Sequence, residues 1–366
     1  MVMTMRIWID LSNAPHAQFF STFIEDLRRS ENEILVTTRK FDHLIGILND
    51  KGIDHKVVGK HGGATLEGKL KASSERIHEL TDIVSNFEPD ISISKHSVEA
   101  PRVAFGLDIP TVTVADNEHA TAQNKLIFPL ADKIITPSSI PKKTLVKQGA
   151  NEESIVTYNG FSEIAHVDNF KPNSKVLKKL SLNPEQPIIV MRTVPIKANY
   201  YEENNGSMVY DIIPELNQKS DSQIVLFPRS EDQKKRLSKF DVIIPENTID
   251  SLSLLNYSDL MIGAGGTMNR ESIAIGTPAI STYPQELLSV TRYLIEKDLL
   301  VHTTKTESTL KETKKLLKTN KNYKNKLKEC INPINIITRT IEDITGEGVL
   351  KTSNIATKEE TIKEKA

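Results

Sequence analysis

The sequence predicts an α/β protein with two Rossmann-like domains, each built on a parallel sheet. Short apolar runs alternate with longer amphipathic stretches, as in strand–helix–strand units. This alternation occurs twice, on either side of a polar stretch that contains two prolines. The unusual polar residues mostly follow predicted strands, where open α/β sheets bind their ligands. We expect the two sheets to face each other across a cleft.

The first domain is expected to span 1–165. Its strands are predicted at 6–11, 33–38, 55–59, 91–94, 111–114 and 133–136. Its helices are predicted at 17–29, 67–86 and 97–106. In the second of these helices, Leu70, Ile77, Leu80, Ile83 and Val84 recur at helical spacing.

The second domain is expected to span 187–345, after a linker at 166–186, and to end with a C-terminal helix. Its strands are predicted at 187–192, 223–228, 241–245, 259–263 and 278–282. Its helices are predicted at 206–218, 231–239, 249–256, 267–276 and 286–297. The segment 346–366 has little apolar content and is predicted to be a disordered tail.

Composition excludes several classes of protein. Lys and Arg number 47 against 48 Asp and Glu, which argues against a dedicated nucleic-acid binder. The single cysteine, Cys330, cannot build a disulfide framework or a cysteine zinc site, and the histidines lack metal-ligand spacing, so neither metal nor cofactor is expected. No apolar run reaches membrane-span length and no signal peptide begins the chain, which predicts a cytoplasmic protein. Peripheral membrane contact and the oligomeric state stay open.

The stretch GAGGTMNRE at 263–271 predicts a phosphate site. Gly265 and Gly266 permit close backbone approach, and the next helix presents the N–H groups of Thr267 and Met268 at its positive end. Glu271 could accept hydrogen bonds from a ribose, or it could simply favour the helix N-terminus. A nicotinamide fold is the weaker interpretation, because the third glycine of G-x-G-x-x-G is missing.

Two arginines follow strands of the second domain. Arg192 ends its first predicted strand and Arg229 follows the next. Guanidinium groups at these positions can neutralise a diphosphate. The alternative is that both are exposed loop residues with surface partners.

Polar residues also follow three strands of the first domain. Asn13 and His16 come after the first strand, and His16 is either a base or a helix-start residue. Lys95, His96 and Glu99 gather after the strand at 91–94, where Ser97 could simply cap a helix.

The densest of these groups follows the strand at 111–114. Asp116, Asn117, Glu118 and His119 are consecutive, and a quartet this polar is costly to bury without partners. We expect it at the edge of a cleft, where one acid could deprotonate an acceptor hydroxyl. Alternatively, the quartet begins a helix and is solvated.

The stretch GAGGTMNRESIAIGTPAI resembles the nucleotide-sugar signature of GT-B fold proteins. The relatives that it suggests are the UDP-N-acetylglucosamine 2-epimerases and the transferase that adds N-acetylglucosamine to lipid-linked muramyl peptide. Over about 1–340 the chain also resembles an uncharacterised, mainly archaeal GT-B-like family. In the named enzymes a Gly-Gly turn opens a helix that binds diphosphate, and a glutamate on that helix binds ribose, which implies this role for Glu271. SNAPH replaces the transferase's glycine-rich loop, with His16 at the position of its histidine.

This resemblance implies a glycosyltransferase that uses a UDP-linked sugar and an unknown acceptor, without bound metal. The catalytic candidates are His16, Asp116, Glu118 and His119, and Asn13, His96 and Glu99 are candidate acceptor or sugar contacts. The chain lacks the epimerases' R-P-E turn, and their paired glutamates become Arg270 and Glu271. An epimerase-like enzyme and a non-catalytic nucleotide-sugar-binding protein remain the alternatives.

Overall fold

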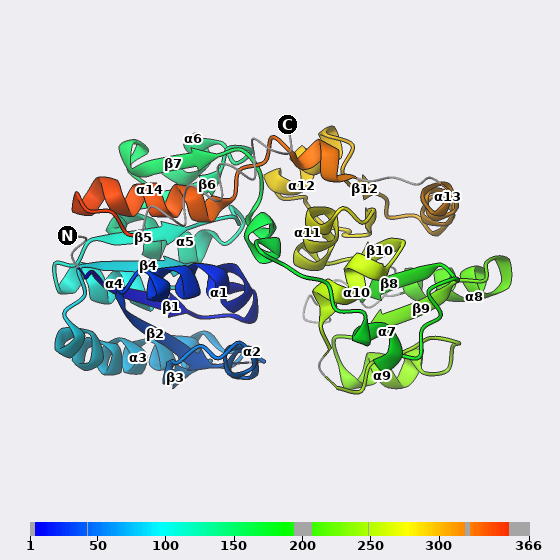
Figure 1. The fold of residues 1–366 in the computed structure, drawn as a ribbon, viewed down its shortest axis with the longest axis horizontal. Helices are drawn as coiled ribbons and strands as arrows, with labels where there is room; N and C mark the ends of the chain where they lie inside the picture. The colour runs from blue at the N-terminus through cyan, green and yellow to red at the C-terminus, as the bar shows by residue number, and fades with distance from the viewer. Residues whose placement is uncertain (1–3, 42, 194–206, 248, 319–322, 351–366) are drawn as a thin grey trace. The chain divides into compact units, whose positions relative to one another are not determined.

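The computed structural model describes residues 4–41, 43–193, 207–247, 249–318 and 323–350. They form two compact units (Figure 1). The first unit contains the described residues up to 168 and from 331 onward, and the second contains those from 169 to 330. Each unit is built on a parallel sheet, as the sequence predicts.

Within the described residues, the first unit has a seven-stranded parallel sheet in the order β3-β2-β1-β4-β5-β6-β7. Its strands are β1 (Arg6–Leu11), β2 (Glu33–Lys40), β3 (Lys56–Lys60), β4 (Ile91–Lys95), β5 (Thr111–Val114), β6 (Lys133–Pro137) and β7 (Ile155–Tyr158). The strand order reverses between β1 and β4, which pair side by side from Ile7↔Ile91 to Asp10↔Ser94. Such a reversal leaves a crevice at the carboxyl ends of the two strands.

Helices cover both faces of this sheet. They are α1 (Ala14–Arg29), α2 (Leu44–Asp50), α3 (Leu66–Phe87), α4 (Glu99–Gly106), α5 (Thr121–Ile127), α6 (Lys142–Val146) and α14 (Pro333–Thr345), with short 3-10 turns η1 (Phe128–Leu130), η2 (Glu152–Ser154) and η3 (Ser162–Val167). Successive strand residues point to opposite faces. Accordingly, Ile7 and Ile9 pack with α1, whereas Trp8 packs with α3 and α4.

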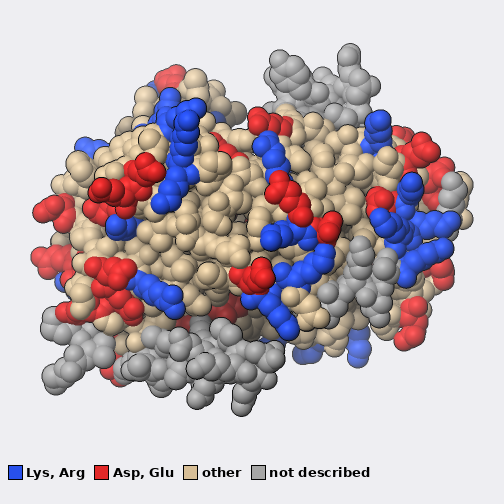
Figure 2. Space-filling view, turned by 90° about the horizontal axis from the view of Figure 1, so that it is seen from above, with Lys and Arg blue, Asp and Glu red and all other residues tan. Residues whose placement is uncertain are grey.

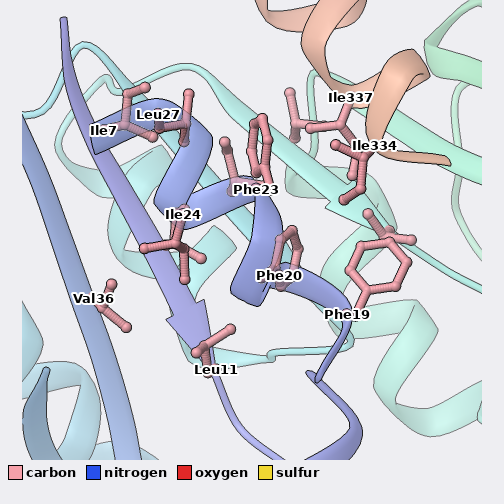
Figure 3. Packing of buried hydrophobic residues seen from close by; sticks show 14 of the residues in the cluster. Ile7, Leu11, Phe19, Phe20, Phe23, Ile24, Leu27, Val36, Ile334 and Ile337 are labelled. Carbon is pink, nitrogen blue, oxygen red and sulfur yellow. The ribbon is translucent and has the colours of Figure 1, made fainter. Parts of the chain in front are cut away.

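The last helix belongs to the first unit, not to the second domain as expected. Ile334, Ile337 and Ile341 of α14 are buried in the same cluster as Phe19 and Phe23 of α1. Figure 3 labels Ile334 and Ile337 in this cluster. Their spacing of three and four residues gives α14 one apolar face, and that face completes the first unit's core.

The predicted start of the disordered tail, at residue 346, is wrong, because ordered residues continue beyond it. Gly346 ends α14 in the left-handed conformation, and Val349 is buried in the core of the first unit. The carbonyl of Val349 accepts a hydrogen bond from Asn32 Nδ2 at 2.9 Å. The rest of the predicted tail, 351–366, lies outside the described residues.

The described part of the second unit has a five-stranded parallel sheet in the order β12-β11-β10-β8-β9. The strands are β8 (Ile188–Arg192), β9 (Gln223–Phe227), β10 (Leu260–Gly263), β11 (Ala279–Ser281) and β12 (Val301–His302). Here the order reverses between β8 and β10, which places Arg192 opposite Gly263 at the carboxyl ends. The predicted strand at 241–245 is wrong: only Ile243 forms a bridge, to Val225, and Pro245 cannot donate to a ladder.

The second unit's helices are α7 (Lys175–Lys179), α8 (Ser207–Lys219), α9 (Glu231–Leu237), α10 (Ser251–Tyr257), α11 (Gly266–Ile275), α12 (Ser289–Glu296) and α13 (Thr306–Leu317), with the 3-10 turn η4 (Tyr323–Leu327). Side chains of α8 and α13, among them Ile212, Ile213 and Leu316, pack with Ile189 and Ile262 of the sheet. On the face shown in Figure 2, acidic and basic side chains are interspersed, in keeping with the net charge of -1.

Candidate functional site

In the second unit, a side-chain hydrogen bond braces the turn from β10 into α11. Asn269 is buried in α11, and its Nδ2 donates to the carbonyl of Gly263 at 2.8 Å. Gly265 is the extended N-cap residue and offers no side chain to cap the helix. The first backbone N–H groups of α11 therefore meet no capping side chain from Gly265.

The glycines of this turn are required by close contacts. A Cβ at residue 263 would lie 2.6 Å from Asn269 Oδ1, and one at residue 265 would lie 2.6 Å from Arg229 Nη2. A Cβ at Gly266 would collide with Arg270 Nη1. The absence of side chains thus lets two guanidinium groups approach the start of α11.

Three arginines surround this helix start. Arg229 Nε donates to the Thr193 carbonyl at 3.0 Å, which holds its guanidinium beside Gly265. Arg192 Nη1 lies 3.9 Å from the sulfur of Met268, and Arg270 lies in α11 itself. The first turn of α11 contains no acidic residue. Because cations are unfavourable at the positive end of a helix, this arrangement favours a bound anion.

The structure therefore brings together the predicted phosphate-binding residues of the second unit. Gly266 is exposed, Thr267 is half-buried and Met268 is buried in the first turn. Glu271, predicted to contact ribose, is half-buried in the next turn. This corner lies at the carboxyl ends of β8 and β10, where the strand order reverses and where open α/β sheets bind their ligands.

The first unit gathers a second polar cluster at its own reversal point. Lys95 Nζ lies 2.6 Å from Asp116 Oδ2 and 4.6 Å from the centre of the Phe19 ring. His96 Nε2 lies 3.2 Å from Asp116 Oδ1 and accepts from the Asp116 backbone N–H at 3.1 Å. The predicted residues His96 and Asp116 therefore touch, with Lys95 as their common neighbour.

His16 belongs to the same electrostatic environment. It is buried in α1, and its Nδ1 lies 3.4 Å from Ser12 Oγ. Burial holds the pKa of His16 well below 6.5, and the charge of Lys95 lowers it further, with smaller effects of His96 and Arg39, while Asp116 opposes the shift. The imidazole of His16 is thus neutral at pH 7 and can accept a proton or a hydrogen bond.

His96 has an unusual backbone. Its φ of 46 lies in the left-handed region, which costs a non-glycine residue about 1–2 kcal/mol. Its Nδ1 is buried without a hydrogen-bond partner in the described part of the chain. Strained residues with such unused polar atoms concentrate at functional sites.

Glu99 lies in a buried ionic network instead of standing free. Asp10 accepts hydrogen bonds from Thr37 Oγ1, Ser97 Oγ and both terminal nitrogens of Arg76, at 2.6 to 3.2 Å. Arg76 Nη1 also lies 3.3 Å from Glu99 Oε2. Burial would raise the pKa of Asp10, but the charge of Arg76 and these hydrogen bonds hold it below 3.8. Ser97, the residue after His96, is thereby tied to Asp10, and Glu99 is tied to Arg76.

The remaining sequence-predicted residues of the first unit lie apart from that contact. Glu118 is buried, and its carbonyl accepts from Gln148 Nε2 at 2.8 Å. His119 is exposed and donates its backbone N–H to Asn117 Oδ1. Asn13 accepts from Arg39 Nη2 at 3.1 Å.

Arg39 was missed at the sequence level. It lies at the carboxyl end of β2, the same sheet edge as Asn13 and His16, and a position just after the strand predicted at 33–38 was the available signal. Over the described residues, no group of three or more His, Cys, Asp or Glu is arranged to hold a metal ion. No helix among them has the length and apolarity needed to cross a bilayer.

Solved structures with low sequence identity share this fold. The Methanocaldococcus jannaschii UDP-GlcNAc 2-epimerase in complex with UDP-GlcNAc and UDP superposes with a TM-score of 0.70 at 17% identity, covering 92% of this chain and 99% of that one. The spinosyn forosaminyltransferase SpnP superposes with a TM-score of 0.63 at 14% identity, covering 94% and 100%. These likenesses confirm the predicted GT-B-like fold class.

Two comparisons of sequence identify the family. An uncharacterized protein of Methanocaldococcus jannaschii is 44% identical over 307 residues, which cover 82% of this chain and 89% of that protein. A family model described as a protein of unknown function, DUF354, matches residues 5–345. The chain therefore belongs to the DUF354 family.

Proposed function

We propose that the protein is a glycosyltransferase that uses a nucleotide-activated sugar, UDP-linked, as its donor. The observation that carries the proposal is the start of α11, where glycines and the guanidinium groups of Arg192, Arg229 and Arg270 surround free helix N–H positions. This chemistry suits a diphosphate, whose negative charge grows when it leaves the sugar. Glu271, one turn along the same helix, is the proposed ribose contact.

The first unit supplies the acceptor side in this proposal. A hydroxyl of the acceptor attacks the anomeric carbon, the bond from that carbon to the diphosphate oxygen breaks, and the hydroxyl proton passes to a base. His16 is the proposed base because it is buried and neutral. Asp116 holds an ion pair with Lys95, and Glu118 and His119 are second candidates.

An epimerase that acts on UDP-GlcNAc is the second candidate function. It is favoured by the likeness to solved UDP-GlcNAc 2-epimerases and by the contact of Asp116 with Lys95 and His96. Epimerisation at C2 requires groups that remove a proton and return it. The predicted relation to the lipid-linked muramyl peptide transferase belongs to the transferase proposal. A non-catalytic nucleotide-sugar-binding protein would bind UDP without turnover.

Calorimetry with UDP tests the site. We expect saturable binding by the wild type and at least about tenfold weaker binding by Arg229→Gln, which loses a charged donor. Arg236→Gln is the matched control, because Arg236 is an exposed arginine of α9 in the same unit. The absence of UDP binding by the wild type would overturn the proposal.

Two assays then separate the reactions. Release of UDP from a UDP-sugar that depends on an added acceptor supports transfer. Incorporation of deuterium from D2O at C2 of UDP-GlcNAc supports epimerisation instead. Binding without either reaction supports the non-catalytic alternative.

A further inference from the structure

The turn between β1 and α1 of the first unit binds Arg39, which forms no ion pair with an acidic residue in the described part of the chain. Arg39, at the carboxyl end of β2, donates its Nε to the carbonyl of Ser12 at 2.9 Å and its Nη2 to Asn13 Oδ1 at 3.1 Å. Its guanidinium also lies over the ring of Phe41, 5.2 Å from the centre. These three contacts fix the side chain, and none of them neutralises its charge.

No carboxylate of the described residues lies within ion-pair distance of Arg39. The acids that act on it at longer range, Glu99 and Asp10, are both already bound to Arg76. A half-buried guanidinium is costly to desolvate unless it is paired. Burial lowers the pKa of Arg39, but a guanidinium stays protonated in proteins, so Arg39 keeps its positive charge. In the described part of the chain its Nη1 forms no hydrogen bond.

The position of Arg39 relates it to the proposed acceptor side. The Ser12 backbone that it binds belongs to the residue whose hydroxyl lies 3.4 Å from His16 Nδ1. Its charge is the smallest of the causes that act on the pKa of His16, and it lowers that pKa. Asn13, whose oxygen is used by Arg39, still has an Nδ2 amide that can donate.

We propose that Arg39 and Asn13 form a binding site for an oxyanion, a phosphate or carboxylate group carried by the acceptor substrate. The inference rests on the proposed function, since it assigns the chemistry of the acceptor that His16 activates. The planar guanidinium binds two oxygens of the anion in parallel, and the Asn13 amide binds one of them. This fixed charge selects acceptors that carry a negative group over neutral ones.

The test is a titration of the full chain with inorganic phosphate and, separately, with acetate, followed through the imidazole NMR signals of His16 and His96. We expect a saturable shift of the His16 signals in the wild type. Arg39→Gln should weaken this binding about tenfold or more, and Asn13→Ala should weaken it less. Tighter binding of phosphate than of acetate identifies a phosphorylated acceptor, and the reverse order identifies a carboxylated one.

Three further variants serve as controls for the titration. Arg29→Gln removes an exposed arginine from the far end of α1 and should titrate like the wild type. Arg39→Lys keeps the charge but not the planar pair of donors, and should retain part of the binding. Arg229→Gln should leave the His16 response unchanged, because its site lies in the other unit.

Calorimetry with UDP on the same samples checks their folding and separates the two proposals. If Arg39→Gln binds UDP normally and loses the His16 response, the oxyanion site is supported. If Arg39→Gln titrates like Arg29→Gln, or if the wild type shows no saturable response, the oxyanion site is overturned. A wild type that fails to bind UDP but shows an Arg39-dependent response overturns the donor site alone.

Discussion

The ammonium of Lys95 lies 2.6 Å from Asp116 Oδ2, and both side chains are largely buried. Removal of one partner from such a pair leaves an uncompensated buried charge, which costs about 3–5 kcal/mol. We therefore expect Lys95→Met to lower the free energy of unfolding by about this amount. Urea denaturation at pH 7 measures it. Lys71→Met, which breaks an exposed pair with Glu67, should cost no more than about 1 kcal/mol.

Asp10 gives the stability of the first unit a dependence on acid pH. Its pKa is held below 3.8 by Arg76, so its contribution is complete above that pH and is lost as the pH falls towards the lowered value. Asp10→Asn should destabilise the protein by about 3–5 kcal/mol at pH 7, because Arg76 stays buried with reduced compensation. Unfolding curves on either side of pH 3.8 should show a steeper loss in the wild type than in the variant. Equal slopes would contradict the assignment.

His16 makes the stability of the protein depend on pH in a higher range than Asp10 does. Its folded pKa lies well below 6.5, so the unfolded chain binds a proton that the folded protein does not. Stability should fall as the pH drops from 6.5 towards the folded pKa and should be insensitive to His16 above 6.5. His16→Gln should flatten this part of the curve of melting temperature against pH. His119→Gln, at an exposed position, should leave the curve as it is.

Gly265→Ala tests the turn before α11. The added methyl group would lie 2.6 Å from Arg229 Nη2, so the guanidinium must move away from the helix start. We expect UDP to bind about tenfold more weakly, with a small change in melting temperature. Gly46→Ala is the matched control: no atom lies within 4 Å of its added Cβ. Gly46→Ala should bind UDP normally. Its free energy of unfolding should rise by about 0.5–1 kcal/mol, because alanine in α2 reduces the backbone freedom of the unfolded chain.

Much of the fold was predictable because its strands are short apolar runs at parallel-sheet positions. Every predicted strand of the first unit overlaps an observed one, from β1 to β6. Two strands were not predicted: β7, whose exposed Thr157 interrupts its apolar run, and the two-residue β12. The segment at 241–245 is apolar enough for a strand, yet only one of its residues pairs. An apolar run in the sequence indicates that a segment is buried, whereas strand formation also depends on hydrogen bonds to a neighbouring strand.

The candidate sites were predictable only in part, for the same reason. Strand ends located Arg192, Gly265, His96 and Asp116, because carboxyl ends share one edge of a parallel sheet. Nothing in the local sequence of α3 indicates that Arg76 is buried against Asp10, since that contact joins residues 66 positions apart. The same limit concealed Arg39, whose importance arises from its contacts with Ser12 and Asn13.

The return of α14 to the first unit imposes an order of events on protein synthesis. Residues 169–330 emerge from the ribosome before Ile334, Ile337 and Ile341 can cover the apolar surface beside α1. Until then the nascent first unit exposes that surface to water and to chaperones. The half of the protein that is translated first is therefore completed last.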